Sequence, residues 1–265
     1  MDIFNVIRQG YRHLGRMRWV SKPTAGAVPP GTCFIASDMG DTVWKSSGAM
    51  WMPSMGLQPR VLFKDDFKRP NTALGSLGAG WTLTGNGVAQ TQVKDGKYIL
   101  PQTDPVNVRT VYACRNLPFK PTYLAVRFNW KSNGGTSGMR KTVALLLCKT
   151  GTLGNVLESV HITLDTQVAT QVLSAGGSFI HLVNVFTPPD SAIAPDGTPH
   201  LLEVYVFGPL VITQIDGLIS GYADAPAHVL PVNPAQQIIV EHYSPSGRDI
   251  QYELEVNEIL AGLAY

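Results

Sequence analysis

Three glutamates near the end of the chain are the residues best suited to acid–base chemistry. Glu253, Glu255 and Glu258 stand close together in the segment Glu-Leu-Glu-Val-Asn-Glu. Two carboxyl groups on one face, one acting as nucleophile or base and the other as acid, can cleave a glycosidic bond. In a regular strand the side chains alternate between faces, so Glu253 and Glu255 share one face and Glu258 lies on the other unless a bulge intervenes. The spacing therefore predicts no catalytic pair.

The same segment resembles the Glu-x-Asp-x-x-Glu strand of jelly-roll glycosidases, in which one carboxylate attacks the sugar and another protonates the leaving oxygen. Two features depart from that pattern: the middle acid is Glu255 rather than Asp, and the segment ends seven residues from the C-terminus, whereas the glycosidase strand lies mid-chain. The alternative is a last strand with Tyr252, Leu254 and Val256 facing the core and the acids facing solvent. We therefore expect no enzymatic activity.

The remaining candidate residues indicate no cofactor and no metal centre. The histidines lack the spacing of metal ligands, and no phosphate loop, dinucleotide motif or Gly-x-Ser-x-Gly occurs. Asp65 and Asp66 could bind Ca²⁺, but turn capping is the simpler expectation because Ca²⁺ takes about six to eight oxygen ligands. Tyr222 and Tyr243 could stack on a sugar, or could be ordinary residues at strand ends.

Composition favours a folded, β-rich protein. Of 265 residues, 44% are hydrophobic and 15% charged, with 26 glycines and 19 prolines for turns. No apolar run approaches the roughly 18 residues of a membrane span, and the first residues do not resemble a secretory signal. The cysteines, Cys33, Cys114 and Cys148, are too few and too scattered for a disulfide framework, which predicts folding in a reducing cytoplasm.

Charge is unevenly distributed along the chain. Residues 1–149 hold 20 Lys and Arg against 7 Asp and Glu, whereas residues 150–265 hold one basic residue and 12 acids. We expect strands of the two halves to interleave, so that opposite charges meet across neighbouring strands. Nucleic-acid binding is not expected, because basic residues are not interleaved with aromatics beyond the first 22 residues.

The first 22 residues are predicted to form a basic amphipathic helix, over 2–18, that acts as an anchor. The apolar residues at helical spacing are Phe4, Ile7, Tyr11 and Leu14, and the arginines on another face are Arg8, Arg12 and Arg16. The helix could dock on its own domain or on a partner protein, lie on a membrane surface, or be a frayed terminus. Docking is favoured because an isolated helix of about four turns is marginal in water.

Residues 23–58 are predicted to form a Pro/Gly-rich arm followed by a small β-meander with strands at Cys33–Ala36, Thr42–Lys45 and Met50–Met52. A meander of about 20 residues is too small to own a core. We therefore expect Trp44 and Trp51 to pack against a neighbouring domain, subunit or protein.

The meander resembles a short module of tail-fibre and other structural proteins of tailed bacteriophages, in which Gly-Thr-x-x-aromatic/Ile-Ala-Ser/Thr-Asp runs into Trp-x-Ser/Asn-x-Gly-x-x-Trp-x-Pro. The matching residues are Gly31, Thr32, Phe34, Ala36, Ser37, Asp38, Trp44, Gly48, Trp51 and Pro53. The resemblance covers about a tenth of the chain.

Residues 59–265 are predicted to form one all-β domain, an antiparallel β-sandwich. Short strands from Val61–Phe67 to Ile250–Val256 alternate with turns such as Asp95-Gly96 and Asp216-Gly217. The segment from Asp65 to Tyr98 resembles the opening of a concanavalin-A-like, or laminin-G-like, jelly roll. His200–Gly217 resembles the central hairpin of that fold, which hosts lectins, enzymes and inert structural domains alike.

These resemblances imply a bacteriophage virion protein, a tail fibre or a head-fibre (decoration) protein, that folds in the host cytoplasm. Its N-terminal region would attach to other virion proteins, and its jelly roll would project outward and bind a host-surface glycan. A homo-oligomer, with a trimer favoured, and no membrane insertion are expected. The residues predicted for attachment are Phe4, Ile7, Arg8, Tyr11, Arg12, Leu14, Trp44 and Trp51. The alternative is a carbohydrate-active enzyme or free lectin of the same fold, which predicts a face with paired acids or stacked aromatics.

Overall fold

The computed structural model describes residues 13–39, 41–100, 109–132, 141–146, 159–164, 168–173, 179–181, 183–184, 196–208, 210–224, 236–244 and 252–264. The chain divides into two compact units. The N-terminal unit comprises residues 1–60 together with 264–265, and the second unit comprises residues 61–263. The proposed three-part division into 1–22, 23–58 and 59–265 stays a prediction.

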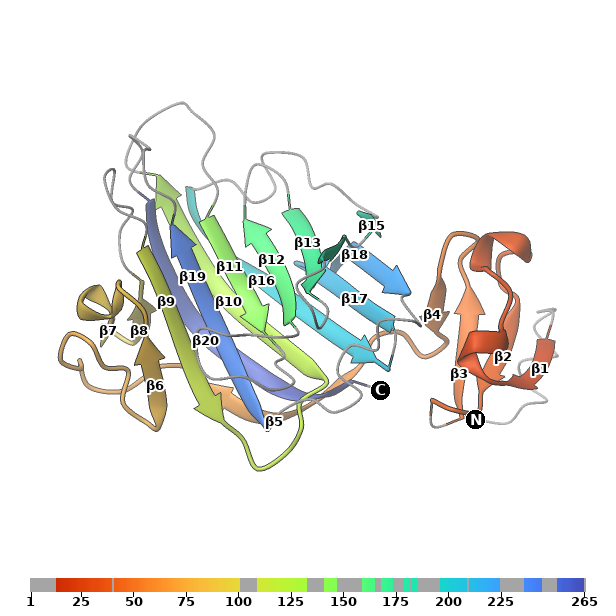
Figure 1. Cartoon of the computed structure of the whole chain (residues 1–265), viewed down its shortest axis with the longest axis horizontal. Helices are drawn as coiled ribbons and strands as arrows, with labels where there is room; N and C mark the ends of the chain where they lie inside the picture. The colour runs from red at the N-terminus through yellow and green to blue at the C-terminus, as the bar shows by residue number, and fades with distance from the viewer. Residues whose placement is uncertain are drawn as a thin grey trace. The chain divides into compact units, whose positions relative to one another are not determined.

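The N-terminal unit is built on a small sheet, drawn in red and orange in Figure 1. Within its described residues the strands follow the order β1 (His13–Met17), β2 (Cys33–Ala36), β3 (Thr42–Ser46) and β4 (Trp51–Pro53). The last three form the antiparallel meander that the sequence predicts. Two 3-10 turns, η1 (Trp19–Ser21) and η2 (Ala25–Ala27), precede β2.

The predicted N-terminal helix is wrong where the structure describes it. His13–Met17 forms strand β1, which pairs in parallel with β2, and the amide of Ser37 donates to the carbonyl of Met17 at 2.9 Å. A short helix is marginal in water, so the hydrogen bonds offered by the edge of β2 outweigh helical spacing here. Leu14 and Arg16 therefore lie on a strand. Phe4, Ile7, Arg8, Tyr11 and Arg12 lie outside the described residues.

A cluster of four aromatic rings forms the centre of the N-terminal unit. The Trp19 ring lies 4.7 Å from Trp44 and 5.7 Å from Phe34, and Phe34 lies 4.8 Å from Trp51. The four side chains are at most 1% exposed. The meander does pack on a neighbour, Trp19, which precedes it and contacts both Phe34 and Trp44. Because this neighbour lies within the N-terminal unit, Trp44 and Trp51 are buried without the expected second domain, subunit or protein.

The second unit is a sandwich of two antiparallel sheets, which confirms the predicted jelly-roll fold class (Figure 1). Within the described residues, one sheet has nine strands. Its order is β15 (Val183–Asn184), β18 (Leu218–Asp224), β17 (Leu210–Ile215), β16 (Asp196–Phe207), β10 (Tyr123–Ser132), β20 (Tyr252–Ala264), β8 (Lys97–Ile99) and β7 (Gln92–Lys94), with β5 (Pro59–Asp65) also paired to β20.

The other sheet has seven strands within the described residues. Their order is β14 (Phe179–His181), β13 (Val168–Leu173), β12 (Ser159–Leu164), β11 (Lys141–Leu146), β19 (Gln237–Ser244), β9 (Arg109–Asn116) and β6 (Trp81–Thr84). A 3-10 turn, η3 (Val88–Gln90), precedes β7. No helix among the described residues has the length and apolar character needed to cross a membrane.

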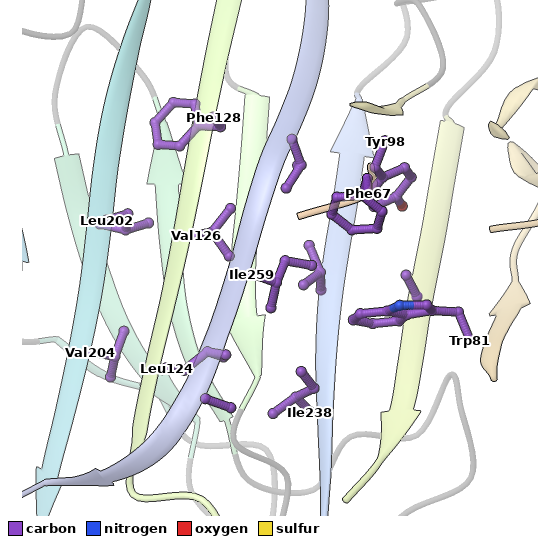
Figure 2. Close-up of a cluster of buried hydrophobic side chains, with 14 of the residues drawn as sticks. Phe67, Trp81, Tyr98, Leu124, Val126, Phe128, Leu202, Val204, Ile238 and Ile259 are labelled. Carbon is purple, nitrogen blue, oxygen red and sulfur yellow. The ribbon is translucent and has the colours of Figure 1, made fainter. Parts of the chain in front are cut away.

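Buried apolar side chains from both sheets form the core of the sandwich. Alternate residues of β10 (Leu124, Val126 and Phe128) point inward together with Ile259 of β20 and Ile238 of β19 (Figure 2). Because inward and outward residues alternate along a strand, the intervening residues of β10 and β20 face outward. This outward side of the nine-stranded sheet is called the outer face below.

Two Asp-Gly sequences that predict turns form tight hairpins in the structure. Asp95 and Gly96 join β7 to β8, and Asp216 and Gly217 join β17 to β18. All four residues have positive φ, at 52°, 73°, 51° and 80°. Two positive-φ residues in a two-residue loop define a type I′ turn, whose twist matches that of the strands. Asp-Gly is a preferred sequence for this turn.

The buried hydroxyl of Tyr98 is expected to lower the stability of the fold. Tyr98 on β8 is fully buried, and among the described residues its hydroxyl has no hydrogen-bond partner. Burial also raises the pKa of this phenol, so the hydroxyl stays protonated. A buried donor without a partner costs roughly 1–3 kcal/mol. We expect Tyr98→Phe to raise the free energy of unfolding by about 1 kcal/mol in urea denaturation, whereas a loss of stability would mean that the hydroxyl is satisfied.

Candidate functional site

A bulge in β20 places two of the three C-terminal glutamates on the same face. Arg127 of β10 pairs with Glu258, but the next residue, Phe128, pairs with Val256, so Asn257 is an extra residue in β20. Phe128 and Val256 both face the core. Glu255 and Glu258 therefore both lie on the outer face. The prediction that strict alternation separates them is wrong because of this bulge.

Glu253, the first of the three glutamates in β20, pairs with Lys131 of β10. Its side chain is outside the described part of the structure, and so are those of Tyr252 and Leu254. Val256 faces the core as expected of a last strand.

Glu255 and Glu258 belong to a polar surface that we call the outer strip, formed by Lys64, Lys97, Arg127, Asn129, Glu255 and Glu258. Glu258 accepts from Lys64 of β5 at 2.5 Å, and its other oxygen lies 3.6 Å from Arg127. Glu255 accepts from Lys97 of β8 at 2.5 Å and from the amide of Asn129 at 2.7 Å. Both carboxylates are thus held by residues of neighbouring strands.

These contacts confirm the expected pairing of the basic and acidic halves of the chain. Lys64, Lys97 and Arg127 come from the basic half, and Glu255 and Glu258 from the acidic half. The hydrogen bond and the charge of Glu258 raise the pKa of Lys64, so this amine stays protonated.

A buried carboxylate lies beside the outer strip on the same face. Glu203 of β16 is opposite Ala125 of β10 and accepts hydrogen bonds from the hydroxyls of Tyr123 and Tyr205, both at 2.9 Å. Burial raises the pKa of each phenol, and the charge of Glu203 raises it further. Both hydroxyls therefore remain protonated donors to Glu203.

The two tyrosines considered for sugar stacking lie on different sheets. Tyr222 lies on β18 in the nine-stranded sheet, where it pairs with Ile212 and Val183, and its side chain is half-buried. Tyr243 lies on β19 in the seven-stranded sheet, paired with Thr110 and Thr142. The two residues belong to different sheets of the sandwich, and the side chain of Tyr243 lies outside the described part of the structure.

Asp65 is held by hydrogen bonds of the fold. One oxygen accepts from the amide of Phe67 and from Arg69, and the other accepts from Arg69 and from the indole of Trp81, at 2.7–3.0 Å. These four donors occupy the oxygens that Ca²⁺ would need. Burial alone would raise the pKa of Asp65, but the hydrogen bonds from Arg69, Trp81 and Phe67 outweigh it and lower the pKa.

Asp66 caps the same turn, accepting from the amide of Lys68 at 3.2 Å. Across the described residues, no group of three His, Cys, Asp or Glu side chains is arranged to hold a metal ion.

Sequence reasoning missed most of the outer strip. It singled out Glu255 and Glu258 but not Lys64, Lys97, Arg127 or Asn129, and it did not find Glu203. Lys97 and Glu255 are 158 positions apart in the chain. Only the order and register of β5, β8, β10 and β20 bring these residues together, and a lone Lys or Arg in a strand carries no local signal of its partner.

No known protein-family profile and no curated protein sequence matches the chain. Solved structures do match the jelly roll. A non-specific endo-β-1,3(4)-glucanase of family GH16, SCLam, is 12% identical with a TM-score of 0.54, covering 78% of this chain and 94% of that chain. A Bacillus licheniformis β-glucanase is 14% identical with a TM-score of 0.53, covering 77% and 99%.

A third match comes from work on endo-acting O-glycanases of human gut microbiota that initiate mucin breakdown. It is 14% identical with a TM-score of 0.53, covering 77% of this chain and 99% of that chain. At identities this low, the structural likeness shows a shared fold and nothing more.

The interpretation as a structural protein of a phage virion without enzymatic activity is therefore corrected. The matching structures come from glucanases and from work on O-glycanases, and nothing in the fold supports a virion protein. The phage-like motif covers only about a tenth of the chain. Three of its residues, Phe34, Trp44 and Trp51, form the aromatic cluster of the N-terminal unit, so the motif reflects local packing. For this chain the matches show the jelly-roll fold, which the alternative expectation of a carbohydrate-active enzyme or free lectin shares.

Proposed function

We propose that the chain is a carbohydrate-active enzyme that cleaves glycosidic bonds, with Glu255 and Glu258 as its carboxylate pair. The observation that carries this proposal is the bulge at Asn257, which brings both carboxylates to the outer face. The likeness of the fold to glucanases and to an O-glycanase structure supports it.

The backbone spacing suits two-carboxylate chemistry. Glu255 and Glu258 lie opposite Asn129 and Arg127, which are two residues apart on β10 and hence about 7 Å apart along the strand. Carboxyl groups about 5–5.5 Å apart are typical of enzymes that retain the configuration of the anomeric carbon. Groups about 6.5–9.5 Å apart are typical of enzymes that invert it. Side chains that start about 7 Å apart can reach either separation. One carboxylate would serve as nucleophile or base and the other as acid.

A screen for release of reducing ends from polysaccharides tests this proposal. Glu255→Gln and Glu258→Gln keep the size of each side chain but remove its acid–base chemistry, so each should lower turnover by about 10²–10⁴-fold. Asp66→Asn is the matched control, because Asp66 is a carboxylate outside the outer strip, and it should retain turnover. Robust turnover that survives both glutamine substitutions would show that the chemistry lies elsewhere.

Binding without cleavage is the second candidate function. Both carboxylates are ion-paired, to Lys64 and Lys97, whereas a general acid must carry a proton. Affinity electrophoresis on the polysaccharides of the same screen separates the two functions. Retardation of the full chain by a polysaccharide that it does not cleave would identify a lectin.

A further inference from the structure

Among the charged side chains of the outer strip, the cations are more exposed to solvent than the carboxylates. The strip has three cations, Lys64, Lys97 and Arg127, against two carboxylates, Glu255 and Glu258. The cationic side chains are 54%, 40% and 44% exposed, whereas those of Glu255 and Glu258 are 26% and 16% exposed. The cations therefore reach further into solvent than the acids with which they pair.

Arg127 is the cation of the strip with the longest contact to a carboxylate. Each carboxylate already has a lysine at 2.5 Å. The Nε of Arg127 is 3.6 Å from Glu258, which is longer than a hydrogen bond, and among the described residues its guanidinium makes no closer polar contact. Arginine presents five N–H donors in a rigid fork that matches the paired oxygens of a carboxylate or sulfate. At Arg127 this fork is available to a ligand.

We propose that the outer strip binds an acidic glycan and that Arg127 pairs with the carboxylate or sulfate group of one sugar. This inference rests on the proposed function, because it names the class of glycan that the same face takes. A negative charge on the ligand would give Arg127 an anionic partner of its own. A neutral glycan would leave Arg127 with only its longer contact to Glu258, a carboxylate that Lys64 already neutralises.

The affinity of the full chain for three polysaccharides tests this inference. The probes are alginate, which carries carboxylates, a carrageenan, which carries sulfates, and neutral laminarin. We expect an acidic probe to bind more tightly than laminarin, and its binding to weaken as salt rises. Arg127→Gln should lower the ratio of acidic to neutral affinity by about tenfold, the size expected for a lost charge-assisted hydrogen bond.

Two further variants separate charge from geometry. Arg127→Lys keeps the charge but loses the fork, so it should recover only part of the ratio. Arg18→Gln is the matched control. Arg18 belongs to the N-terminal unit, is 72% exposed and lies 3.8 Å from Asp38, so its loss removes a similar exposed cation and should leave the ratio unchanged.

The outcomes distinguish this inference from the proposed function. If alginate or the carrageenan binds and Arg127→Gln alone lowers the ratio, the inference is supported, and the stronger probe identifies the acid group. If laminarin is the only probe that binds, the inference is wrong, and the proposed function stands only if laminarin is also cleaved. If Arg127→Gln and Arg18→Gln lower the ratio equally, the effect is one of net charge and the inference is wrong. If no glycan binds or is cleaved, both fail.

Discussion

Asp65→Ala should destabilise the jelly roll by about 3–5 kcal/mol, because it leaves Arg69 as a partly buried charge without its partner. Asp65 also accepts from the indole of Trp81 and the amide of Phe67, which connects β5 to β6. Urea denaturation followed by far-UV circular dichroism measures the loss. Asp66→Ala removes a neighbouring, more exposed carboxylate and should cost less than about 1 kcal/mol. Equal losses in the two variants would contradict this role of Asp65.

The same carboxylate predicts a dependence of stability on acid. The pKa of Asp65 is lower in the folded chain than in the unfolded chain, so its contribution is fully present above the unfolded value, near pH 4. The contribution is lost as the pH falls through the lowered folded value. The difference in unfolding free energy between the unaltered chain and Asp65→Asn should therefore shrink below about pH 4. A difference that grows on acidification would contradict the assigned direction.

Trp44→Ala should unfold the N-terminal unit while leaving the jelly roll folded. Trp44 is fully buried and its ring lies 4.7 Å from that of Trp19. Truncating a packed tryptophan costs about 3–5 kcal/mol, and a core this small rarely supplies more than that. Limited proteolysis should then cleave within residues 13–60 and leave a resistant fragment containing residues 61–263.

Met55→Ala is the control, because Met55 lies in the same unit and is 62% exposed. It should leave the proteolysis pattern unchanged. If Trp44→Ala made the jelly roll equally susceptible to protease, the two units would depend on each other for stability.

Local patterns in the sequence predict most of the fold. Alternating strands and Asp-Gly turns predicted the sandwich, and the meander strands were placed within about one residue. The last strand was predicted to end at Val256, whereas β20 continues to Ala264. Ala261 and Gly262 have low strand propensity, but they pair with Leu124 and Tyr123 of β10, so tertiary pairing decides the conformation there.

The candidate site was less predictable, for a different physical reason. Alternation separated Glu255 from Glu258, and one extra residue, Asn257, reversed that conclusion. A bulge depends on how two distant strands fit, so the local spacing of the glutamates could not reveal it. The same holds for the helix expected over residues 2–18, where pairing with β2 outweighs helical spacing at His13–Met17.

A crystal structure of the chain with a bound oligosaccharide would show whether the outer strip is the glycan site. The oligosaccharide should come from the polysaccharide that binds best in the affinity measurements, and Glu258→Gln would prevent its cleavage. We expect the sugar to lie on the outer strip, in contact with Glu255, residue 258 and Arg127. A sugar bound on the seven-stranded sheet or on the N-terminal unit, with the outer strip empty, would contradict it.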